Sequence, residues 1–516
     1  MGCAKQIGKI PPFFGPFFPV SGLFFWHIYG ITGLLRFRIG EGNRMATQKQ
    51  GQAGYQIDMV HGPLAGKILL FALPLMLSSL LQLLFNAADV VVVGRCAGKE
   101  ALAAVGSTSS LINLLVNLFV GFSVGTNVVV ARDLGGGRED DVHSSVHTAI
   151  AISLISGVLL AILGVSLARQ LLVWTSSTPD VIDLAAIYLR IYFLGMPVNM
   201  LYNFGSAILR AQGDTRRPLY YLAIAGVTNV ALNLLFVIVF EMSVAGVALA
   251  TIISQAVSAM LVLSCLMRDQ GPLHLDLRKL HLDKRIVKRI LQVGLPAGFQ
   301  GIVFSLSNVV IQSSINSFGS TAIIAGSSAS ANIEGFVYVS MNSFYQTDLT
   351  FTSQNYGAGE CRRVDRSLLL CQLYSLIFGL VLGNLAVFFG YPLASIYAPG
   401  EEEVIAQAML RLKYVCSLYC LCGVMDVMVG ALRGLGYSVV PMIVSMVGAC
   451  GVRLLWIATV FQVYHTPAVL FLSYPVSWTI TAAVHIGFFF FIRKRAYAKC
   501  GIHGMRPDDL PPEKAR

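Results

Sequence analysis

One ionisable side chain interrupts a long apolar stretch near the start of the chain. Asp89 lies within residues 73–94, which are otherwise apolar enough to cross a bilayer. Gln82 and Asn86 precede it at spacings that place all three side chains on one face of a helix. An acid at membrane depth is costly to leave against lipid, and such residues usually line cavities or proton relays. Asp89 is therefore the first candidate for a cation-coupling site.

The second half of the chain carries intramembrane acids of its own. Asp426 and Glu334 both lie in apolar segments. We expect them to line a cavity and to take part in cation coupling. The alternative is that they pair with the buried Arg453 or make polar contacts between helices.

Amide and aromatic side chains recur at helical spacing near these acids. Asn113 with Asn117, and Asn308 with Gln312, are each four residues apart, and each pair could face a substrate or hydrogen-bond to a neighbouring helix. Aromatic rings and thioethers can hold a planar cation without tight geometry, and the candidates are Tyr192, Tyr202, Tyr338 and Met341. The predicted substrate cavity comprises Gln82, Asn86, Asn113, Asn117, Asn308, Gln312, Tyr338 and Asn342.

The elements that must position these residues are transmembrane helices. The chain has 516 residues, of which 55% are hydrophobic and 12% charged, whereas soluble domains average about 25% charged residues. We therefore predict an all-α membrane protein with about twelve spans. These spans are expected near residues 67–94, 101–130, 146–168, 181–207, 217–240, 243–267, 288–315, 321–352, 367–390, 404–431, 438–461 and 467–492.

The net charge of +11 is explained by topology and does not require a nucleic-acid partner. Arg and Lys follow the even-numbered segments, most densely in residues 268–289 and 493–499, and Arg433 is assigned to the loop after the tenth segment. The other loops are poor in basic residues. By the positive-inside rule, both ends of the helical array are expected in the cytoplasm. Residues 1–60 are expected to be a disordered extension or a start-site artefact, with Met45 and Met59 as alternative starts.

An internal repeat divides the chain into two halves. At an offset of 222 residues, Pro74 corresponds to Pro296, and Gly135-Gly136-Gly137 corresponds to Gly357-Ala358-Gly359. We predict two homologous bundles of six helices, residues 61–270 and 288–495, joined by a cytoplasmic linker at 271–287 and followed by a tail at 496–516. Because six is even, the repeats run parallel and are related by an axis along the membrane normal.

The chain resembles the multidrug and toxic compound extrusion family of transporters. The resemblance covers nearly all of residues 61–495 and depends on five motifs. They are Ala-Asp-Val-Val-Val-Val-Gly at 88–94, Leu-Gly-Gly-Gly-Arg at 134–138, Leu-Arg-Ala-Gln-Gly-Asp-Thr at 209–215, Ser-Gln-Asn-Tyr-Gly-Ala-Gly at 353–359 and Ala-Leu-Arg-Gly-Leu-Gly at 431–436. The resemblance implies a V-shaped pair of bundles that exports organic, often cationic, compounds in exchange for protons or sodium ions.

The resemblance also implies roles for individual residues. Asp89 falls at the family's first-helix aspartate, and Asn229, Asn233 and Thr251 match a cation site of one branch of the family. That branch has an Asp where this chain has an amide, so a sodium ion would have only the carboxylate of Asp89 for charge. Another branch uses a Glu on the seventh helix, but residues 299–310 contain no acid. The chain therefore departs from both coupling schemes.

The expected mechanism is competition for negative charge. A carboxylate in a cavity of low dielectric takes up a proton from outside and releases it when a cationic substrate arrives. No cofactor is expected beyond the coupling ion, and no metal site except a possible sodium at Asp89. The expected partners are small organic substrates and membrane lipids, with the functional monomer in a bacterial plasma membrane.

Two other classes of function are compared with transport of this kind. A membrane enzyme would need a nucleophile, a metal motif or an acid–base constellation, and no His-Glu-x-x-His motif or cluster of Cys and His is present. A flippase for lipid-linked precursors would need several basic residues in its cavity to bind a pyrophosphate. The cavity candidates here are acids and amides, with Arg453 as the main intramembrane base, which favours cationic cargo.

Overall fold

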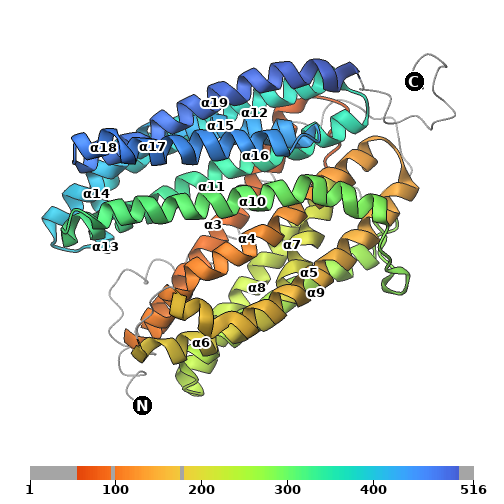
Figure 1. Ribbon diagram of the computed structural model, residues 1–516. Coiled ribbons are helices and arrows are strands. Elements are labelled where there is room, and N and C mark those ends of the chain that lie inside the picture. Colours follow the sequence, from red (N-terminus) through yellow and green to blue (C-terminus); the bar gives the residue numbers. More distant parts are fainter. Residues whose placement is uncertain (1–54, 95–98, 175–178, 499–516) are drawn as a thin grey trace.

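The computed structural model describes residues 55–94, 99–174 and 179–498, and within these ranges the chain forms helices and turns without a strand (Figure 1). The predicted all-α class is therefore confirmed. The first half comprises α3 (Leu64–Val92), α4 (Lys99–Gly135), α5 (Glu139–Trp174), α6 (Pro179–Leu194), α7 (Met196–Ala211), α8 (Arg216–Leu234) with a π-helical turn (Leu235–Val239), and α9 (Ser243–Met267).

The second half repeats the order of the first with more interruptions. It comprises α10 (Lys284–Asn316), α11 (Thr321–Gly357), α12 (Cys361–Phe388), α13 (Gly390–Tyr397), α14 (Glu402–Val415), α15 (Tyr419–Gly434), α16 (Val439–Ser445), α17 (Val452–Ala458), α18 (Val460–Val463) and α19 (Pro467–Ala498). A short 3-10 turn (Cys416–Leu418) joins α14 to α15, and a π-helical turn (Met446–Gly451) joins α16 to α17.

Ten helices in the described ranges are long and apolar enough to cross a membrane, and a bent pair brings the number to eleven. That pair is α6 and α7, which meet at Gly195 with an angle of 46°. Pro197 stands in the first turn of α7, where its missing N–H breaks the continuity of the hydrogen bonds. The bend therefore falls inside the expected segment 181–207.

The remaining expected span, residues 321–352, lies in α11 and is too polar to be recognised by hydropathy. At about 1.5 Å per residue, a helix of 37 residues is long enough to cross a bilayer. Its C-terminal half is almost completely buried, including Thr347, Asp348, Thr350 and Ser353, because it packs among α3, α4, α12 and α15. Small polar side chains suit such close helix packing.

The two halves form separate lobes. In Figure 1 the lobes lie together where α10 begins and draw apart towards α6 and α13, so that the molecule is V-shaped. α3 belongs to the first lobe through its contacts with α8, but it also packs against α11 and α12 of the second. We call residues 64–267 the N-lobe and residues 284–498 the C-lobe.

Glycines on α4 and α10 let the lobes approach backbone to backbone. A side chain at Gly121 would collide with the backbone of Gly294 and Gly298, and one at Gly125 would collide with the carbonyl oxygen of Ile290. Near the C-terminal ends of α4 and α15, the Arg132 guanidinium donates to the Gly434 carbonyl oxygen at 2.9 Å. The lobes are therefore in tight contact on the side where the linker lies.

The glycine turns confirm the repeat. Gly137 and Gly359 have φ angles of 66° and 79°, and Gly213 and Gly436 have 99° and 90°. These left-handed conformations favour glycine, and each pair lies within one residue of the offset of 222 residues found in the sequence. The motif at 134–138 is thus a helix end and a tight turn.

The packed part of the chain begins before the boundary expected at residue 61. Residues 1–54 of the predicted extension lie outside the described ranges. Met59 is completely buried in the C-lobe core, and the Ile57 N–H donates to the Gly213 carbonyl oxygen of the N-lobe at 3.2 Å. Arg363 of α12 donates to the carbonyl oxygens of Met59 and Gly62. The short segment 55–62 therefore connects the two lobes.

Candidate functional site

Four of the predicted coupling residues meet in the N-lobe. Asp89 of α3 accepts a hydrogen bond from the Asn233 side-chain amide of α8 at 2.5 Å. The same amide donates to Asn229 Oδ1 at 3.2 Å, and the Asn229 amide donates to Thr251 Oγ1 of α9 at 3.5 Å. Residues distant in the sequence thus form one cluster, which we call the Asp89 cluster.

The Asp89 cluster contains a single charged group. Asn229 and Asn233 are buried, and among the described residues no ion pair involves Asp89. Asn233 Oδ1 is buried and accepts no hydrogen bond there. Because carboxylate, amide and hydroxyl oxygens are ligands of hard cations, the cluster offers oxygen atoms to a small cation and one carboxylate to a proton.

Gln82 and Asn86 do not join this cluster. Both side chains are exposed on α3, and neither lines the cavity described below. The face of α3 that packs on α8 carries Phe85, whose ring touches Gly226, together with Asp89. The predicted polar stripe therefore contributes one residue to the described site.

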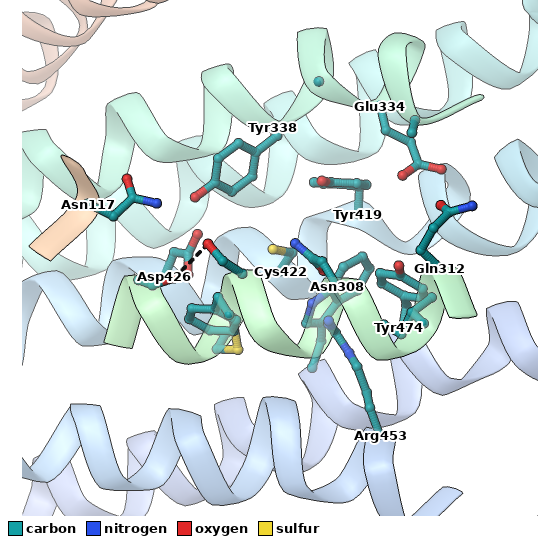
Figure 2. A pocket seen from close by; sticks show the side chains of 18 of the residues that line it. Asn117, Asn308, Gln312, Glu334, Tyr338, Tyr419, Cys422, Asp426, Arg453 and Tyr474 are labelled. Carbon is teal, nitrogen blue, oxygen red and sulfur yellow. Dashed lines mark hydrogen bonds between the residues drawn. The ribbon is translucent and has the colours of Figure 1, made fainter. Parts of the chain in front are cut away.

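A second site lies in the C-lobe as a cavity of about 720 Å³ (Figure 2). Helices α10, α11, α15 and α19 provide most of its wall, and α4 of the N-lobe closes one side. Six predicted residues line it: Asn117, Asn308, Gln312, Glu334, Tyr338 and Asp426. Asn342 lies one turn beyond and donates to the Tyr338 hydroxyl at 3.5 Å. The side chain of Asn113 lies outside the described part of the chain.

Glu334 is already engaged by an arginine. Its two carboxylate oxygens accept hydrogen bonds from Arg411 of α14 at 2.8 and 3.0 Å, and Ser330 donates to the same carboxylate. Both charged side chains are buried. The partner is Arg411, whereas the sequence suggested Arg453. A bidentate pair of this kind neutralises both charges within the protein.

Arg411 and Arg433 line the cavity together with Arg453, which corrects the expectation that Arg453 is its main base. Arg433, assigned from the sequence to a cytoplasmic loop, lies in the last turn of α15 and is only 5% exposed. Its guanidinium donates to the Tyr345 hydroxyl at 2.6 Å and to Gln300 Oε1 at 2.7 Å, and these bonds hold it in the protein interior. Arg433 was missed because it directly follows a long apolar run and matches the pattern of a loop, whereas Arg411 lies within the expected segment 404–431, where no motif marks it.

Arg453 itself is positioned by an irregular helix. The π-helical turn (Met446–Gly451) precedes it, and such turns change which face of a helix a side chain occupies. Its Nε donates to Ser477 Oγ at 2.9 Å, and its guanidinium carbon lies 4.3 Å from the centre of the Tyr474 ring. Figure 2 shows Arg453 extending towards Asn308 and Tyr474, with Asp426 and Tyr338 at the other end of the cavity.

Three side chains suggested for holding a planar cation lie away from the cavity. The Tyr202 hydroxyl donates to the Pro218 carbonyl oxygen in the N-lobe, and Tyr192 packs on the N-lobe core. Met341 is completely buried beside Ser375. Tyr338 alone of the four lines the cavity. Among the described residues, no three His, Cys, Asp or Glu side chains are grouped as metal ligands.

Comparisons with known proteins agree with the repeat and the fold. The MatE family model matches residues 74–235 and again residues 296–458, which together make more than half of the chain. The chain is 27% identical over 435 residues to the probable multidrug resistance protein YoeA of Bacillus subtilis, covering 83% of this chain and 93% of that protein.

A more distant relative has a different named cargo. The FAD transporter of Shewanella oneidensis is 23% identical over 77% of this chain and 87% of its own length. Among solved structures, an outward-facing conformation of a multidrug resistance MATE family transporter superposes with a TM-score of 0.80 at 20% identity, covering 87% of this chain and all of that one. The latter similarity concerns the fold alone.

Proposed function

The chain belongs to the MatE family of multi-pass membrane transporters, and from that premise we propose that it is a secondary antiporter that exports organic compounds in exchange for protons or sodium ions. The cargo class follows from relatives named as multidrug resistance proteins. As in the sequence-based expectation, the protein acts as a monomer in the bacterial plasma membrane, with both ends of the helical array in the cytoplasm.

The observation that carries the proposed coupling is the Asp89 cluster. It has one carboxylate, three neutral partners and no neighbouring arginine among the described residues. A proton or a sodium ion can therefore bind there without first displacing a protein cation. A fixed carboxylate at membrane depth also needs a positive partner for part of the cycle, and the coupling ion supplies it.

Alternating access uses the two lobes as rigid bodies. The lobes draw apart on the side away from the linker (Figure 1), and the glycine contacts between α4 and α10 hold them together on the linker side. Export requires the reverse arrangement, in which Gly121 and Gly298 part. The break between α6 and α7 is a place where the N-lobe can bend during that change.

The test is dye efflux from vesicles that contain the purified full-length protein, with a proton gradient or a sodium gradient imposed separately. One gradient should drive export of the dye, and Asp89→Asn should abolish that export. Asp183→Asn is the matched control, because Asp183 is an exposed acid on the N-lobe surface whose ion-pair partner among the described residues is Arg169. Export that is unchanged in Asp89→Asn, or independent of both gradients, would refute the proposal.

A flippase for lipid-linked precursors is the second candidate. It predicts basic residues in the cavity, and Arg411, Arg433 and Arg453 line it. The Glu334 carboxylate neutralises Arg411, however, and the matched relatives are named as drug-resistance proteins. Export of soluble organic compounds therefore remains the first proposal, and the lipid alternative is tested below.

A further inference from the structure

The C-lobe cavity has a positive excess of charge. Five charged side chains line it: Glu334, Asp426, Arg411, Arg433 and Arg453. Glu334 and Arg411 cancel each other through their bidentate contact. The remaining set is Arg433 and Arg453 against Asp426, and in the described part of the chain neither arginine forms an ion pair.

Arg453 has guanidinium N–H donors that face the cavity. It is 4% exposed, and Ser477 is its one hydrogen-bond partner among the described residues. Its other nitrogens lie on the side that faces Asn308 (Figure 2). A buried guanidinium that lacks a carboxylate partner carries an uncompensated desolvation penalty. A ligand with two adjacent oxygens would satisfy it by parallel hydrogen bonds.

Arg433, seven residues after Asp426 on α15, adds further positive potential to the cavity. Its two partners, Tyr345 and Gln300, are neutral, so they fix the guanidinium without neutralising it. Its Nε is buried and has no hydrogen-bond partner in the described residues. A cation drawn to Asp426 would therefore be repelled by Arg433 and Arg453 together.

Aromatic rings provide the rest of the recognition surface. Tyr338, Tyr419, Tyr474 and Trp478 line the cavity, and the Tyr474 ring is already stacked with the Arg453 guanidinium. A volume of about 720 Å³ suits a drug-sized ligand with fused rings. Flat rings can stack on these side chains while an acidic group reaches Arg453.

We infer that the C-lobe cavity binds an aromatic organic anion, a compound with a planar ring system and a carboxylate or phosphate group, and that Arg453 anchors the acidic group. This inference rests on the proposed function only in taking the cavity as the place where exported cargo sits. It replaces the cationic cargo expected from the sequence, because the negative charge of Glu334 is neutralised within the protein.

The test measures binding to the purified full-length protein in detergent, without any ion gradient. Fluorescein and rhodamine 6G share a xanthene ring system and have opposite charges, so their fluorescence anisotropy compares charge at nearly constant shape. Riboflavin 5′-phosphate and riboflavin compare a phosphate with its absence. We expect fluorescein, the flavin phosphate or both to bind at least about tenfold more tightly than the matched cationic or neutral compound, as loss of a charge-assisted hydrogen bond implies.

The variant Arg453→Gln should weaken binding of the anionic probes about tenfold or more and leave rhodamine 6G binding unchanged or stronger. Arg495→Gln, an exposed arginine at the cytoplasmic end of α19, is the matched control and should bind like the wild type. Should Arg453→Gln fail to fold, the comparison of the paired dyes on the wild type still decides the matter.

Three results would overturn the inference. Tighter binding of rhodamine 6G than of fluorescein and the flavin phosphate would restore the cationic cargo. Equal binding of charged and neutral partners would remove any role for the arginines. Binding of farnesyl pyrophosphate with no binding of the soluble anions would favour a lipid-linked precursor. None of these results depends on a gradient, so failure here is distinguishable from failure of ion coupling in vesicles.

Discussion

The N-lobe and the C-lobe share a backbone plan and differ in the charge they hold. The Asp89 cluster has one carboxylate among neutral partners, whereas the C-lobe cavity has two arginines against one free carboxylate. At the repeat offset of 222 residues, Asp89 corresponds to Ile311 and Arg453 corresponds to Ala231. The repeat thus preserves glycine turns and helix order, while each lobe has acquired its own charged residues. We interpret the difference as a division of labour between ion coupling and cargo binding.

The largest expected effect concerns Glu334, the C-lobe acid that is paired with Arg411 and is expected to stabilise the fold. Glu334→Gln should lower the free energy of unfolding by about 3 kcal/mol or more, because it leaves Arg411 buried without a partner. Thermal unfolding in detergent measures this loss. The double variant Glu334→Gln with Arg411→Gln should recover part of it, since no buried charge is then left over. A single variant as stable as the wild type would mean that the pair of Glu334 and Arg411 does not stabilise the C-lobe.

The next effect concerns the free acid of the C-lobe cavity. Asp426→Asn should strengthen fluorescein binding at least about tenfold, because a negative charge some 5 to 10 Å from the ligand is removed at an effective dielectric of about 20. Rhodamine 6G binding should weaken in the same variant. Anisotropy titrations measure both, with Asp183→Asn as the control. Unchanged affinity for both dyes would show that Asp426 does not face the bound ligand.

A gain of charge in the N-lobe should have a smaller effect. Asn233→Asp places a second carboxylate beside Asp89, and two carboxylates attract a sodium ion more strongly than one. We expect sodium to stimulate transport several-fold more in this variant than in the wild type, at an ionic strength of about 0.1 M or below, where electrostatic screening is modest. Vesicle efflux with sodium or choline chloride inside and outside measures the difference. A variant that shows no added sodium response would place the coupling ion elsewhere.

The smallest effect is expected on the exposed face of α3. Gln82→Ala and Asn86→Ala alter side chains that join neither the Asp89 cluster nor the C-lobe cavity. Transport rates should remain within about twofold of the wild type, as exposed substitutions away from special contacts usually do. Initial rates of dye efflux decide this point. A loss as large as that of Asp89→Asn would show that the whole stripe lines the path of the cargo.

The sequence predicted the fold and the N-lobe cluster better than it predicted the C-lobe cavity. Apolar length and glycine turns are local patterns, and they correspond directly to observed helices and turns. The offset of 222 residues corresponds to the recurrence of these turns in the two lobes. The link between Asp89 and Asn233 followed from the family resemblance. Arg433 was not identified as a cavity residue, because positive charge near a span end also fits a cytoplasmic loop, and no sequence pattern marked Arg411. Only the three-dimensional packing shows that Arg411 meets Glu334 and that Arg433 meets Tyr345.

α11 shows the other limit of sequence reasoning. Its residues were expected to span the membrane because of their length, although their mean hydropathy is too low for that test. The polar residues Thr347, Asp348 and Thr350 are tolerated since neighbouring helices, and not lipid, surround them. Burial within a bundle therefore cannot be read from the composition of one segment.

The division of labour between the lobes is tested most directly by measuring fluorescein binding to purified Asp89→Asn without a gradient. The account predicts the same dissociation constant as in the wild type, in a variant whose gradient-driven export is lost. A variant in which binding falls together with export would contradict it, because cargo and coupling ion would then share one site.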